Sequence, residues 1–302
     1  MLKRFLSYYK PQMGLFVADT VCALVLAAID LAFPIILRNL TGGLFTQGQA
    51  AIMQALGMIA VGLVLMYAVR CACRYFVSYW GHVMGARMES KMREDLFDQY
   101  ERFSFAYFDR NSSGDMMSRV VNDLFDICEA AHHVPEWIII CGIEIIGSFV
   151  ILFTIAPVLA LAMAVVTAAF AVIMFWQNMR MREVFSDNRK KISGINAQLQ
   201  DSLAGMRVVK SFANEETERF KFRASNNRYL SSKENMYHAM GVYTATYGLL
   251  SGVLYVIVVL LGGWLVAQGQ LQAVDMATFA LYISLFCTPL ETLVNSAETY
   301  QK

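Results

Sequence analysis

The sequence has 302 residues, of which 57% are hydrophobic and only 16% are charged, and its mean hydropathy is +0.45. Soluble domains carry about 45–50% apolar and about 25% charged residues, so this chain has too few charges to cover the surface of a soluble domain. A disordered chain needs the opposite balance, and the net charge of +1 argues against a nucleic-acid-binding protein, whose domain should be distinctly basic. A membrane protein is the class that remains.

The first twelve residues combine basic side chains with apolar ones at helical spacing. The apolar positions are Leu2, Phe5, Leu6 and Tyr9. This pattern predicts a short helix over 1–12 that lies in the cytoplasmic membrane interface and is ended by Pro11. The alternative is a frayed basic terminus.

Six stretches are apolar enough to span the membrane as helices, which requires about 20 residues at 1.5 Å each. The predicted spans are 14–38, 52–80, 134–155, 158–178, 241–267 and 276–299. Pro157 is suited to the start of the fourth span, and Gly269 to the end of the fifth. We therefore predict an all-α membrane protein with six transmembrane helices.

The distribution of Lys and Arg predicts the orientation of the spans. The short connections 39–51, 156–157 and 268–275 contain neither residue, and only Arg38 borders one of them. The segment 81–133 carries six basic residues and the segment 180–233 carries twelve. The positive-inside rule then places the N-terminus and both long segments in the cytoplasm of a multi-pass plasma-membrane protein.

The two long segments, 81–133 and 179–240, are predicted to be helical hairpins. Each continues a span for many residues without proline, breaks at a polar cluster and returns as a second helix. Ser112 with Asp115 resembles a capping box that opens the returning helix of the first hairpin. A helix that projects so far into water is stable only if it packs on its neighbours or on a partner.

Several ionisable or polar residues fall inside the predicted spans, where they usually face a bundle interior or a water-filled cavity. The sixth span carries a polar stripe on one helical face: Ser284, Thr288, Glu291, Asn295 and Glu298. Further candidates for a substrate cavity are Asp30, Arg70 and Glu144. The alternative is that these groups only satisfy one another, for example Arg70 or Arg74 with Glu144 or Glu291.

No metal site is expected from the sequence. Cys71 and Cys73 are two residues apart, which does not match the spacing of zinc ligands. His132 and His133 have no convincing ligand set near them in the sequence, so a structural role is favoured over metal binding.

The tips of the hairpins carry a family resemblance. Residues 103–123 read FSFAYFDRNSSGDMMSRVVND and residues 204–215 read AGMRVVKSFANE. They are similar to the patterns LSFFDxNxxGxLxSRxxND and GxRxVKxFxxE in the transmembrane domain of ATP-binding-cassette exporters, and the predicted topology matches that domain over the whole chain.

The resemblance implies a short coupling helix at each tip, about 111–118 and 214–220, that docks on a nucleotide-binding domain. At the first tip the implied residues are Asn111, Ser112, Gly114, Asp115, Met116 and Ser118. At the second tip they are Asn214, Glu215, Glu216, Thr217, Arg219 and Phe220. The resemblance also implies a homodimer or heterodimer of two such halves around one central cavity.

No GxxxxGK[ST] phosphate loop and no LSGGQ-like signature occur in the sequence. ATP and Mg²⁺ are therefore expected to bind to a nucleotide-binding domain outside these residues. We expect no cofactor to bind to the 302 residues themselves. We favour a continuation of the same chain over a separate subunit.

These features predict the membrane-spanning half of an ATP-driven exporter that moves drugs, lipids or peptides by alternating access. A non-transporting membrane scaffold or regulatory subunit, whose hairpins dock a cytoplasmic partner, is the alternative. A membrane-embedded enzyme is weakly supported, because HExxH, GxSxG and paired histidine ligands are absent from the sequence.

Overall fold

A computed structural model of the protein describes residues 5, 7–46 and 48–299, without the side chains of residues 46, 132, 134 and 290–299. Within these residues every regular element is a helix. Five helices are long and apolar enough to cross a membrane: Lys10–Gly42, Gln49–Glu101, Ser113–Ile155, Pro157–Ala204 and Glu215–Ala267. The apolar stretch at the sixth predicted span, Ala273–Pro289, is shorter, so the all-helical membrane fold is confirmed and the count of six spans stays a prediction.

The chain divides into two compact units. The first contains residues up to Leu161 together with Val258–Pro289, and the second contains Ala162–Ile257 together with the helical residues from Leu290 onward. The helices of the first unit are η1 (Lys10–Gln12), α2 (Met13–Gly42), η2 (Leu44–Thr46), α3 (Gln49–Phe76), η3 (Val77–Gly81), α4 (His82–Glu101), α5 (Phe105–Arg110), α6 (Ser113–Ser118), η4 (Arg119–Asp123), α7 (Leu124–Ile155), η5 (Val258–Gly262), α11 (Gly263–Ala267) and most of α12 (Ala273–Thr299). The second unit holds most of α8 (Pro157–Ala204), then α9 (Met206–Ser211) and α10 (Glu215–Ile257).

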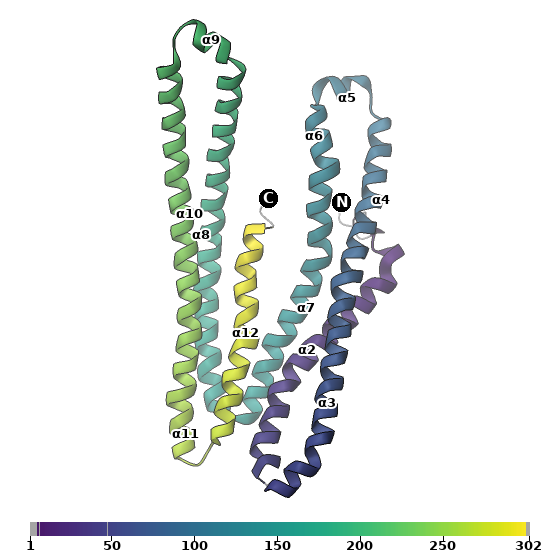
Figure 1. The fold of residues 1–302 in the computed structure, drawn as a ribbon, viewed down its shortest axis with the longest axis vertical. Coiled ribbons are helices and arrows are strands. Elements are labelled where there is room, and N and C mark those ends of the chain that lie inside the picture. Colours follow the sequence, from purple (N-terminus) through teal and green to yellow (C-terminus); the bar gives the residue numbers. More distant parts are fainter. Residues whose placement is uncertain (1–4, 6, 47, 300–302) are drawn as a thin grey trace. The chain divides into compact units, whose positions relative to one another are not determined.

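Each unit contains one of the two long hairpins (Figure 1). In the first unit α4 and α7 are the legs, and α5 and α6 close the tip. In the second unit α8 and α10 are the legs, and α9 lies at the tip. Pro157 begins α8, as expected, because the first helical position needs no backbone N–H.

The N-terminal segment packs on the first hairpin. Tyr9 is buried in a cluster with Met84, Met88, Cys128 and Ala131, and its hydroxyl donates a 2.6 Å hydrogen bond to the Ala131 carbonyl. Burial raises the pKa of Tyr9, so the phenol stays protonated and keeps this bond. Pro11 does not end the segment here: it lies in the short helix η1, which runs directly into α2, because its fixed φ is compatible with a first helical turn.

Polar bonds and one close approach hold α2 against its neighbours in the first unit. Arg38 Nε lies 2.5 Å from Asp275 Oδ1, so the one basic residue beside a short connection is paired. Tyr282 donates a 2.5 Å hydrogen bond from its hydroxyl to the Leu31 carbonyl. A Cβ at Gly147 would lie 2.5 Å from Leu31 Cδ1, so a larger residue there would force the Leu31 side chain on α2 to move.

The legs of the second hairpin are joined by side-chain hydrogen bonds along their length. Hydrogen-bonded pairs join α8 and α10, with the α8 residue given first: Gln177–Thr246, Asn188–Ser232, Gln198–Ser225 and Ser202–Glu218. The partners on α10 fall in number as those on α8 rise, which is the register of an antiparallel pair. Polar side chains therefore hold this hairpin together where it leaves the apolar stretch.

The second tip ends α9 with an αL turn on a non-glycine residue. Ala213 has φ +50°, its amide bonds the Lys210 carbonyl, and the Asn214 amide bonds the Val209 carbonyl. These two bonds form a Schellman motif with Ala213 at the position that glycine usually occupies. Gly269, with φ +72°, ends α11 in the same way, as expected from the sequence.

Replacing Ala213 by glycine is expected to stabilise the second tip. A Cβ in the αL region costs about 1–2 kcal/mol, which A213G removes at the expense of some unfolded-chain entropy. The net gain should slow hydrogen–deuterium exchange of the Ala213 and Asn214 amides severalfold. The matched change A224G inside α10 should destabilise its helix by about 1 kcal/mol. Equal destabilisation by both changes would contradict the αL conformation.

Candidate functional site

Three of the predicted cavity residues come together inside the first unit. Asp30 on α2 forms an ion pair with Arg70 on α3, with Arg70 Nη2 2.8 Å from Asp30 Oδ1. Glu144 on α7 interacts electrostatically with both of them. Two carboxylates therefore share one guanidinium among three apolar helices. Charged groups at such depth are stable only when they face protein or water rather than lipid tails.

Aromatic rings flank this charge cluster. The Arg70 guanidinium carbon lies 5.9 Å from the centre of the Tyr67 ring, and Tyr67 meets Phe33 edge to face at 6.1 Å. A cation over an aromatic face is favourable, so Tyr67 helps to hold Arg70. Tyr67 is not among the residues predicted from the sequence, although its spacing of three from Arg70 on one helix indicates the contact.

The observed pairing differs from the alternative drawn from the sequence. Arg70 forms its ion pair with Asp30 on the neighbouring helix and not with Glu144, and Asp30 had been assigned no partner. Which pair forms depends on how α2 and α3 are rotated against each other, and one-dimensional spacing does not contain that rotation.

The polar stripe of α12 is only partly described. Ser284 and Thr288 are exposed, and their hydroxyls donate to the backbone carbonyls of Leu281 and Ser284. The side chains of Glu291, Asn295 and Glu298 lie outside the described residues. A role for this stripe in a cavity stays a prediction.

The first hairpin tip is a short helix with a defined cap and an apolar groove. Ser112 caps α6 by accepting a 3.2 Å hydrogen bond from the Gly114 amide, and Asp115 lies in the first turn. The groove beside it has a volume of about 400 Å³ and is lined by Phe97, Tyr100, Glu101, Phe108, Met116, Met117 and Val120. Phe105 is 90% exposed, so its ring is open to contact with a partner.

The second tip differs from the predicted coupling helix at 214–220. The short helix at this tip is α9, and residues from Glu215 onward already form the first turns of the long helix α10. Gly205 separates α8 from α9, and the αL residue Ala213 separates α9 from α10. The implied tip residues remain at the tip, and Phe220 is 74% exposed and Phe212 80% exposed.

Glu218 secures the base of this second tip. It accepts a 2.7 Å bond from Lys221 Nζ and a 2.8 Å bond from the Ser202 hydroxyl on α8. These hydrogen bonds, with that from Lys221 the larger contribution, lower the pKa of Glu218. The carboxylate therefore stays ionised and links both legs of the hairpin near neutral pH.

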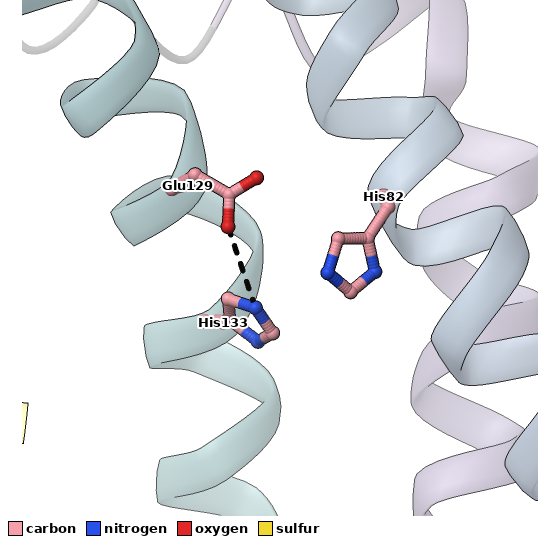
Figure 2. Close-up of side chains that lie close together, drawn as sticks. All are labelled: His82, Glu129 and His133. Atoms are coloured by element: carbon pink, nitrogen blue, oxygen red, sulfur yellow. Dashed lines mark ion pairs between the residues drawn. The ribbon is translucent and has the colours of Figure 1, made fainter.

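His133 is not isolated, contrary to the expectation from the sequence. Its ring centre lies 5.0 Å from that of His82, and its Nε2 lies 3.5 Å from Glu129 Oε2 (Figure 2). His82 is 51 positions earlier in the chain and begins α4, so only the packing of α4 on α7 brings it to His133. The side chain of His132 lies outside the described residues.

The charge cluster predicts an unequal response to its three neutralising substitutions. R70Q leaves the carboxylates of Asp30 and Glu144 without their cation and should lower stability the most of the three, although Arg70 is 39% and Asp30 24% exposed. D30N should lower stability less than R70Q, because Glu144 can still pair with Arg70. E144Q should lower stability least, because the ion pair between Asp30 and Arg70 remains. Thermal unfolding in detergent gives this order.

The matched control is K191Q, which removes an exposed i,i+4 pair with Asp187 on α8 and should cost about 0.3–0.5 kcal/mol. Equal effects of R70Q and K191Q would show that Asp30, Arg70 and Glu144 do not form a coupled charge cluster.

Comparison with known proteins places this architecture in a family. A family model described as ABC transporter transmembrane region matches residues 16–290. The "Uncharacterized ABC transporter ATP-binding protein YwjA" of Bacillus subtilis (strain 168) is 31% identical over 302 residues, which are 100% of this chain and 52% of the relative. An "ATP-dependent lipid A-core flippase" of Syntrophus aciditrophicus (strain SB) is 22% identical over 309 residues, 100% of this chain and 50% of that protein. The chain spans about half the length of the curated relatives it matches.

Proposed function

Because the chain belongs to the ABC transporter transmembrane family, we propose that it is the membrane-spanning half of an ATP-driven exporter of amphipathic molecules. The observation that carries this proposal is the pair of hairpin tips, which expose Phe105, Phe212 and Phe220 at the ends of long helices. These exposed aromatic side chains are available for contact with a protein partner. The partner fits a nucleotide-binding domain, which would supply the ATP and Mg²⁺ site.

The substrate pathway is proposed to include the charge cluster of Asp30, Arg70 and Glu144. It offers two carboxylates and one guanidinium beside the aromatic rings of Tyr67 and Phe33. A cavity that combines charge with aromatic surface suits an amphipathic molecule. The lipid flippase among the relatives supports a lipid as one substrate class, with drugs and peptides as the others.

Transport is proposed to follow alternating access in a dimer of two such halves in the plasma membrane, with the hairpins in the cytoplasm. The first tip is separated from Arg70 by the rest of α3, by η3 and by the whole of α4, so it cannot contribute to substrate binding energy directly. The tips would act by transmitting the state of the nucleotide-binding domains through two-state movement of the hairpins.

The coupling role predicts the effect of a proline at the first tip. M116P removes the hydrogen bond from the Met116 amide to the Ser112 carbonyl and should unfold α6. In the transporter with its nucleotide-binding domains, substrate binding should be retained. Transport of a fluorescent amphipathic dye into inverted vesicles and substrate-stimulated ATP hydrolysis should both be lost.

The matched control is Q49P at the first position of α3, where proline fits because no helical N–H bond is needed. This variant should transport normally. Normal transport by M116P would contradict the coupling role and favour a scaffold whose hairpins serve another partner.

The proposed orientation predicts which positions react with a membrane-impermeant thiol reagent. In a protein without its six native cysteines, A50C and Q270C should be labelled on intact cells. N111C and N214C should be labelled only after permeabilisation. The reverse pattern would overturn the orientation inferred from Lys and Arg.

A further inference from the structure

Three potential metal ligands converge between the legs of the first hairpin. His82 begins α4, while Glu129 and His133 lie one turn apart on α7 (Figure 2). Each residue places one ligand atom, and these three atoms all lie within 4.8 Å of one another. His82 is exposed, and Glu129 and His133 are half-buried, so an ion can reach the site from solvent.

The spacing on α7 suits a shared ion. Side chains at i and i+4 lie on one helical face, which is how paired ligands on a helix converge on zinc. Zinc takes imidazole nitrogen at about 2.0–2.1 Å and carboxylate oxygen at about 2.0–2.2 Å, so tetrahedral ligand atoms lie about 3.4 Å apart. His133 Nε2 and Glu129 Oε2 are already 3.5 Å apart, and the three ligand atoms, all within 4.8 Å of one another, would draw together around a bound ion by rotation of the exposed His82 side chain.

Nearby carboxylates make the site favourable for a cation. His82 also interacts electrostatically with Asp19 on α2 and with Glu136 on α7. The positive charge of Arg74 partly offsets the negative charge of Glu136. Asp19 is 4% exposed, and among the described residues no hydrogen-bond donor reaches its Oδ1. The carboxylates of Asp19 and Glu129 thus lie near the imidazoles of His82 and His133, and a bound divalent ion would offset their negative charge.

We propose that His82, Glu129 and His133 bind a divalent transition-metal ion of the Zn²⁺ type and thereby tie α4 to α7. Two imidazoles and one carboxylate suit Zn²⁺, whereas Mg²⁺ and Ca²⁺ prefer sets of oxygen ligands. Three protein ligands leave a fourth position for water. This proposal does not depend on the exporter function.

Metal titration of the whole protein in lipid nanodiscs, after treatment with a chelator, tests the site. We expect one Zn²⁺ per chain, undisturbed by millimolar Mg²⁺, and a tetrahedral absorption spectrum with Co²⁺. H82A, H133A and E129Q should each weaken Zn²⁺ affinity at least tenfold. H238A is the matched control, because His238 is an exposed histidine on α10, and it should bind as the parent does. Unchanged affinity in H82A and H133A would overturn the proposal.

A second measurement uses the unmodified protein, so it does not depend on whether the variants fold. Diethyl pyrocarbonate modifies accessible imidazoles, and mass spectrometry reports each histidine separately. Saturating Zn²⁺ should slow the modification of His82 and His133 severalfold and leave that of His238 unchanged. If Zn²⁺ left the modification rates of His82 and His133 unchanged, as it should leave that of His238, the proposed site would be refuted.

Discussion

A backbone N–H or C=O group that enters hydrocarbon without a hydrogen-bond partner costs several kcal/mol, and this penalty governs the fold. A chain with five long apolar stretches can meet it only by forming a helix in each of them. The same penalty applies to side chains, which is why the intramembrane charges are grouped. The charge cluster of Asp30, Arg70 and Glu144 joins side chains from α2, α3 and α7. The Tyr282 hydroxyl donates a hydrogen bond to the Leu31 carbonyl on α2.

The two hairpins are stabilised outside the membrane by different kinds of contact. A helix that leaves the membrane loses its apolar surroundings and needs lateral contacts to remain folded. The first hairpin obtains them from an apolar cluster of Tyr9, Met84 and Met88 that the N-terminal segment completes. The second hairpin obtains them from side-chain hydrogen bonds between α8 and α10. Loss of the N-terminal segment would therefore affect the first hairpin and leave the contacts of the second intact.

Both hairpins end in short helices whose boundaries are set by single residues. The hydroxyl of Ser112 begins α6, and the αL turn at Ala213 separates α9 from α10. Large apolar side chains are exposed at both tips, whereas apolar contacts join the legs of the first hairpin and hydrogen bonds join those of the second.

Composition and local pattern by themselves determined the class of protein, the places of the apolar helices, the two hairpins and the cap at Ser112. These depend on hydropathy, helical spacing and turn chemistry between residues near in sequence. The pairing of Arg70 with Asp30, the convergence of His82 on His133, and the packing of Tyr9 on the first hairpin were decided only by the tertiary structure. Each joins residues on different helices, and the rotation and axial shift of one helix against another is set by packing of whole faces. The exact helix boundaries at the second tip were also decided by the structure: Ala213 adopts αL geometry, which its side chain disfavours and which the two Schellman hydrogen bonds stabilise, and α10 begins at Glu215.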